Sequence, residues 1–177
     1  MKCSRHEWDT EDKEWCYKCD DLKYNQVINN KMMNVRIKKL HNDAVIPKYA
    51  KEGDAGLDLV ATSITSSYSL HSGEQITYGT GLAMEIPEGY VGLIFPRSSV
   101  RNTGLSLSNC VGVIDSAYRG EIMGTFNTST REYRNPYKVG DRVMQIIIMP
   151  YPYIKFIESE ELSETDRGTG GFGSTGK

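Results

Sequence analysis

The feature that most constrains the fold is a series of short strand-like segments that runs from Asn34 to near the end of the chain. In the first segment Val35 and Ile37 alternate with Arg36 and Lys38, and similar apolar runs recur between turn signals. The runs lie at residues 35–38, 57–61, 74–78, 82–86, 91–95, 122–126, 143–149 and 153–157. No amphipathic window is long enough for a major helix. This pattern predicts an all-β domain, a sandwich or a jelly-roll barrel.

Composition excludes several classes of protein. The 177 residues suffice for one domain of ordinary size with a real core. No apolar run approaches the roughly 20 residues of a membrane-spanning helix, and the first residues lack the apolar region of a signal peptide. We therefore expect a cytoplasmic protein without a membrane partner, whose four cysteines are free or metal-bound. A formal net charge of −2 argues against nucleic acid as a partner.

The chain divides into three expected regions. Residues 1–33 form an N-terminal extension that ends in a polar linker, residues 34–160 form the β domain, and residues 161–177 form a glycine-rich tail. So much glycine cannot pack a core or hold a strand. Arg167 can clamp phosphate oxygens, Phe172 offers a flat face to a base, and backbone N–H groups around Ser174 can surround an anion. The tail is typical of a lid over a nucleotide, and a flexible tail is the alternative.

Five polar clusters are not explained by packing: residues 54–59, 96–99, 109–121, 140–145 and the tail. In order and spacing they resemble the five motifs of the trimeric dUTPase family, over essentially all of residues 34–177. The resemblance implies a β jelly-roll homotrimer that hydrolyses dUTP to dUMP and pyrophosphate with Mg2+. It also implies a role in limiting uracil incorporation into DNA and in supplying dUMP for thymidylate synthesis.

The resemblance assigns the central chemical role to Asp115, as the general base that activates water for attack on the α-phosphorus. A phosphohydrolase needs such a base, together with cations and donors around the phosphates that reduce charge repulsion. From the Ile-Asp-Ser sequence alone, an aspartate that caps its own turn is the alternative.

The remaining substrate contacts implied by the resemblance surround the triphosphate, the sugar and the base. They are Arg97, Ser98, Ser99 and Gln145 for phosphates, Asn109, Val113, Ile114 and Met123 for uracil, Tyr118 for deoxyribose, and Arg167, Phe172, Gly173 and Ser174 for the lid. Asp58 is expected to reach Mg2+ through water. Asp141 and Arg142 are interpreted as structural, a turn and an inter-subunit pair. Family sites combine parts of three subunits, so we expect shared sites.

The N-terminal extension lies outside the resemblance and has its own pattern. The spacings of Cys3 with His6 and of Cys16 with Cys19 are those of zinc ligands. A segment this short cannot fold on apolar burial alone, so we predict a structural Zn2+. Incidental cysteines and a redox-active cysteine pair are the alternatives. We expect a protein partner for this zinc knuckle.

Two other functions are weighed against hydrolysis of dUTP. The dCTP deaminases share the fold, but their pattern has a catalytic glutamate where this chain keeps Asp115 and Tyr118. A module that regulates or binds other proteins, switched by nucleotide, is the alternative from a different class. Retention of Asp115 and Arg167 favours catalysis.

Overall fold

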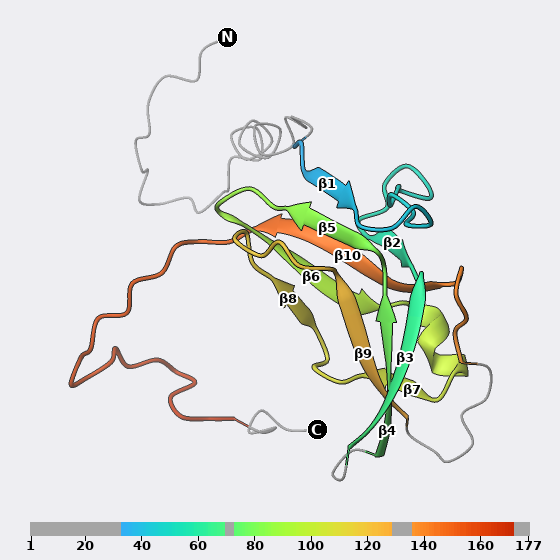
Figure 1. The fold of residues 1–177 in the computed structure, drawn as a ribbon. Helices are drawn as coiled ribbons and strands as arrows, with labels where there is room; N and C mark the ends of the chain where they lie inside the picture. The colour runs from blue at the N-terminus through green and yellow to red at the C-terminus, as the bar shows by residue number, and fades with distance from the viewer. Residues whose placement is uncertain (1–32, 70–72, 129–135, 172–177) are drawn as a thin grey trace. The chain divides into compact units, whose positions relative to one another are not determined.

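The structure is a computed structural model that describes residues 33–69, 73–128 and 136–171. The chain divides into two units after Asn34, and the fold described here is that of the second. Within the described residues this unit consists of β-strands and one short 3-10 helix (Figure 1). The prediction of an all-β domain without a major helix is therefore confirmed. None of the described helical residues forms a segment that is long and apolar enough to cross a membrane.

The strands of the described residues form three antiparallel sheets. A two-stranded sheet pairs β1 (Arg36–Lys39) with β5 (Leu82–Glu85). One four-stranded sheet has the order β2 (Leu57–Val60), β10 (Arg142–Pro150), β6 (Tyr90–Pro96) and β8 (Gly112–Ile114). The other has the order β3 (Ser63–Ser69), β4 (Gly73–Gly79), β9 (Met123–Thr128) and β7 (Leu105–Leu107). The 3-10 helix η1 (Ser98–Asn102) follows β6 directly.

The hydrophobic core lies between the two four-stranded sheets. One sheet contributes Leu59, Ile94, Met144 and Ile146, and the other contributes Ile76, Tyr78 and Phe126, all of them buried. A Cβ atom on Gly124 of β9 would collide with the sulfur of Met144 on β10, so this glycine permits the close approach of the sheets. Each fully buried large apolar side chain stabilises the fold by about 1.5–3 kcal/mol.

Most predicted strands are present, and the differences have physical reasons. Each of the first seven predicted runs contains or overlaps a strand. The run at 153–157 is not a strand in this structure: Tyr153, Phe156 and Ile157 are more than four-fifths exposed, and the segment pairs with no described strand. Of the additional strands, β3 is rich in Ser and Thr, and β7 and β8 have 3 residues each, which is too short for a recognisable pattern.

Candidate active site

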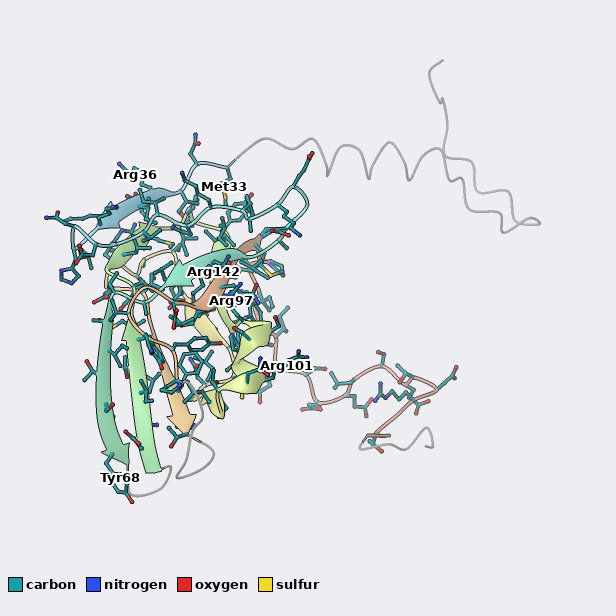
Figure 2. All side chains as sticks on the ribbon, turned by 90° about the vertical axis from the view of Figure 1, so that its right-hand side faces the viewer. Met33, Arg36, Tyr68, Arg97, Arg101 and Arg142 are labelled. Carbon is teal, nitrogen blue, oxygen red and sulfur yellow. The ribbon has the colours of Figure 1, made fainter. Side chains whose placement is uncertain are left out.

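Asp58 lies at the centre of a charged cluster at the ends of three neighbouring strands. Arg97 Nε donates to Asp58 Oδ1 at 2.6 Å, and Arg142 Nη1 donates to Asp58 Oδ2 at 3.1 Å. Figure 2 shows the two arginines close together, with Arg101 on the neighbouring helix η1. Because two guanidinium groups share one carboxylate, the cluster carries excess positive charge. It is suited to bind an anion.

Gln145 connects this cluster to the strand that leads into η1. It lies opposite Asp58 on β2 and opposite Phe95 on β6. Its side-chain amide donates to the carbonyl oxygen of Pro96 at 3.2 Å. A Cβ atom on Gly56 would lie 2.5 Å from the Gln145 amide oxygen, so glycine at position 56 leaves room for this side chain. The register of β10 therefore places the fourth predicted cluster beside the first and second.

The interpretation of Asp141 as a turn residue is confirmed, and the inter-subunit role expected of Arg142 stays a prediction. Asp141 Oδ2 accepts from the backbone N–H of Lys138 at 2.7 Å and so closes the turn before β10. Arg142 pairs with Asp58 of its own chain. The register of β10 with β2 shifts between Arg142 and Met144, and such an irregularity re-aims a side chain.

Ser98 and Ser99 begin the helix that follows Arg97. Arg97 is the N-cap residue of η1 and has an extended backbone. The Oγ atom of Ser99 lies 2.8 Å from the Oη atom of Tyr137. The predicted phosphate contacts Arg97, Ser98, Ser99 and Gln145 are thus brought together in one region, with Arg142 added. The sequence gives no signal for Tyr137, because it lies outside the five polar clusters.

The turn that carries Asp115 and Tyr118 follows β8 directly. The carbonyl oxygen of Asp115 accepts from the N–H of Tyr118 at 3.0 Å, and Tyr118 Oη donates to the carbonyl oxygen of Glu121 at 3.1 Å. A Cβ atom on Gly120 would collide with the Tyr118 ring, so glycine is required for this ring position. Among the described residues, none holds the Asp115 carboxylate, which is exposed. The alternative of a turn-capping aspartate therefore has no support.

Arg119 holds this turn against the rest of the domain, a role that sequence reasoning missed. Its Nη1 donates to the carbonyl oxygens of Ser116 at 2.5 Å and Tyr118 at 2.9 Å, and its Nη2 lies 3.8 Å from Glu85 Oε1 on β5. Glu85 also accepts from Arg36 on β1, and this hydrogen bond holds the pKa of Glu85 below its ordinary value of 4.5. Only the folding of distant strands brings these charges together.

The predicted uracil contacts lie on both sides of the Asp115 turn. Val113 and Ile114 lie on β8, opposite Leu93 and Gly92 of β6, and Asn109 lies in the turn before β8. Met123 begins β9 in the other four-stranded sheet. Val113 and Met123 are exposed and available to a ligand.

The two groups of predicted residues occupy opposite ends of β6. Gln145 is paired with Phe95, near the C-terminal end of β6. Ile114 is paired with Gly92, near the N-terminal end of β6, and Asp115 is the next residue along the chain. Arg97 and Gly92 are about five residues apart, which is roughly 16 Å at the rise of an extended strand. Within one chain the Asp115 turn therefore begins at the end of β6 that is remote from Arg97.

Several predicted residues fall outside this geometry. Phe172, Gly173 and Ser174 of the lid, and the zinc candidates Cys3, His6, Cys16 and Cys19, lie outside the described residues. Arg167 is described, and its Nε donates to the carbonyl oxygen of Gly170 at 3.0 Å. Within residues 33–69, 73–128 and 136–171, no group of three or more His, Cys, Asp or Glu side chains could hold a metal ion.

The chain is similar in sequence and fold to known dUTPases. The dUTPase family model matches residues 42–176. The deoxyuridine 5'-triphosphate nucleotidohydrolase of Finegoldia magna is 44% identical over 146 residues, which cover 81% of this chain and 99% of the relative.

Two solved structures extend the similarity to the fold. A variant of the Staphylococcus bacteriophage 80alpha dUTPase with dUpNHpp has a TM-score of 0.68 and 26% identity, covering 81% of this chain and 99% of its own. A variant of the dUTPase from phage phi11 of S. aureus, whose structure reveals the coordination of a structural Mg(II) ion, has a TM-score of 0.60 and 23% identity, covering 73% of this chain and 98% of its own.

Proposed function

This chain belongs to the dUTPase family and is a dUTP nucleotidohydrolase, and we propose which of its residues bind the substrate and which activate the water in the hydrolysis of dUTP to dUMP and pyrophosphate. The observation that carries the proposal is the contrast between a cationic cluster at one end of β6 and a free carboxylate at the other. The cluster binds the triphosphate, and the carboxylate activates the water.

The phosphate-binding part consists of Arg97, Ser98, Ser99 and Gln145, with Arg142 beside them. Asp58 holds both guanidinium groups in place before substrate arrives. Donors that are fixed in advance stabilise charge that develops on phosphate oxygens without the cost of reorganising water. Loss of Asp58 would therefore weaken binding through the arginines, even though its own charge repels phosphate.

Asp115 is proposed as the general base. Its carboxylate takes a proton from a water molecule as the water oxygen bonds to the α-phosphorus, and the bond from that phosphorus to the bridging oxygen breaks to release pyrophosphate. The exposure of the carboxylate and the lack of a competing donor among the described residues support this role. The hydrogen bonds of Tyr118 and Arg119 fix the turn that carries it.

Substrate selection is proposed to come from the same hairpin. The Tyr118 ring, held by its bond to Glu121 and by the space at Gly120, would lie against the deoxyribose and leave no room for a 2′-hydroxyl. Asn109, Val113, Ile114 and Met123 would surround uracil. Arg167, Phe172, Gly173 and Ser174 would close over the nucleotide as a lid.

The described residues suit Mg2+ that is bound mainly by the substrate and water. Mg2+ prefers oxygen ligands and keeps several waters, and the Asp58 carboxylate retains lone pairs besides those given to the two arginines. Asp58 would thus hold the ion through water. When bound, the ion reduces the negative charge of the phosphates.

A homotrimer with shared sites is proposed because one chain separates the two halves of its site. The exposed apolar side chains of Tyr153, Ile154, Phe156 and Ile157 also support a partner subunit, since such contiguous apolar surface marks an interface. The cysteine spacing supports a Zn2+ bound by Cys3, His6, Cys16 and Cys19, with a protein partner for that extension. A cytoplasmic location fits the sequence composition.

Release of pyrophosphate from a panel of nucleotides tests the function. With Mg2+ present, dUTP should be hydrolysed far faster than dCTP, dTTP or UTP, and chelation of Mg2+ should abolish the reaction. Equal rates for dUTP and UTP would contradict the role of Tyr118. Deamination of dCTP would contradict the family activity itself.

A further inference from the structure

Tyr137 makes one contact that the proposed mechanism does not use. Its hydroxyl lies 2.8 Å from that of Ser99, the second serine after Arg97, and both side chains are partly buried. Tyr137 precedes the turn that leads into β10, 38 positions away from Ser99 in sequence. The contact therefore depends on the fold and links the phosphate-binding helix η1 to the segment before β10.

The position of Tyr137 is set by the core. Its ring packs edge-to-face on Tyr78, with centroids 6.0 Å apart and planes at 80°, and its carbonyl oxygen accepts from Tyr78 Oη at 3.3 Å. Tyr78 is fully buried and packs in turn on Phe126. Because both ring and backbone of Tyr137 are held, its hydroxyl has a defined place and can orient another group.

The direction of the hydrogen bond between the two hydroxyls follows from the chemistry of the ligand. Either oxygen can be the donor in the free protein. A phosphate oxygen only accepts, so a Ser99 hydroxyl that contacts phosphate must give its single proton to that oxygen. The Ser99 oxygen must then accept from Tyr137, because its own proton is already used.

We propose that Tyr137 is a positioning residue that donates to Ser99 Oγ and thereby directs the Ser99 proton toward the triphosphate. The inference rests on the proposed function, in which Ser99 binds phosphate. Hydrogen bonds arranged in one direction polarise and strengthen each other, so the tyrosine increases the donor strength of the serine. In the opposite arrangement Ser99 would donate to Tyr137, and its proton would not be available to the ligand.

The variant Tyr137→Phe tests the proposal, because it removes the hydroxyl and keeps the packing on Tyr78. We expect the KM for dUTP and the Kd for dUpNHpp to rise about fivefold, the scale of one hydrogen bond, with kcat within about twofold. Inhibition by deoxyuridine, which has no phosphate, should be unchanged. Tyr90→Phe is the matched control: it removes the hydroxyl of another partly buried tyrosine that packs against the core, and it should leave KM unchanged.

A double-mutant cycle separates orientation of Ser99 from general support of the helix. Ser99→Ala should raise KM, and Tyr137→Phe in that background should have no further effect, because the tyrosine acts only through the serine. Additive effects, or an unchanged KM in either single variant, would overturn the proposal. Wild-type protein in the same assay tests the function independently: if it released no pyrophosphate from dUTP, the proposed function and this inference would both fall.

Discussion

The two halves of the candidate site are held in place by different means. Around Asp58, charged side chains from β2, β10 and the end of β6 pair with one another, and the Asp58 and Arg97 side chains are only 20% and 26% exposed. Around Asp115, backbone carbonyl oxygens accept the bonds that fix the turn, and the carboxylate stays exposed. A binding group gains from being paired in advance, whereas a base must keep a free lone pair.

The largest expected effect comes from the half that is not paired. Asp115→Asn should lower the turnover of dUTP by roughly 100-fold or more, the usual scale for loss of a general base. The melting temperature should hardly change, because among the described residues nothing bonds to this carboxylate. Steady-state kinetics and thermal unfolding measure the two effects. A fall in turnover of less than tenfold would show that Asp115 is not the base.

The separation of the two halves can be tested by mixing chains. Asp115→Asn and Arg97→Ala chains should each be nearly inactive, and refolding them together in equal amounts should restore about a quarter of wild-type activity if each site takes these residues from different subunits. Each variant refolded alone is the control. Mixed trimers, verified by mass spectrometry, that remain inactive would show that each site takes both residues from the same chain.

A substitution in the paired half of the site should weaken both substrate binding and the stability of the fold. Asp58→Asn removes the charge that holds Arg97 and Arg142, so we expect about tenfold weaker binding of dUpNHpp and a loss of about 1–3 kcal/mol in the free energy of unfolding. Arg36→Ala, which breaks an ion pair on the exposed β1, serves as the control and should cost less than about 1 kcal/mol. Equal losses of unfolding free energy in the two variants would show that the Asp58 cluster contributes no more to stability than a surface ion pair.

The smallest expected effect concerns the support of the Asp115 turn. The hydrogen bond from Arg36 lowers the pKa of Glu85, so its ionised form is favoured in the folded state. Its contribution to stability is therefore present above the ordinary value of 4.5 and is lost as the pH falls through the lower folded pKa. Thermal unfolding of wild type and Glu85→Gln between pH 7 and 3 should show a small difference that disappears at the acid end. A difference independent of pH would contradict this account.

The sequence predicts the elements whose physics is local. Period-two alternation marks a strand that buries one face, as at residues 35–38, where Val35 and Ile37 pack against the core. The polar strand β3 escapes prediction because its residues are mostly Ser and Thr. At residues 153–157 the apolar composition is that of a strand, but no described strand of the chain pairs with it.

Within the site, the residues that touch substrate can be predicted and those that hold them cannot. The motif pattern identifies Arg97, Gln145 and Asp115 by residue type and spacing. Arg142 pairs with a residue 84 positions away, and Tyr137 with one 38 positions away. No local periodicity reports such contacts, because the folding of separate strands creates them.

The irregularity in β10 allows two site residues to share a face despite an odd spacing. Side chains alternate between the faces of a regular strand, so Arg142 and Gln145, three positions apart, would point to opposite faces. The register shift between Arg142 and Met144 buries an extra residue, Val143, and leaves both polar side chains beside Asp58. Grafting this cluster onto a regular strand would therefore require an even spacing between the arginine and the glutamine, because only the irregularity permits the spacing found here.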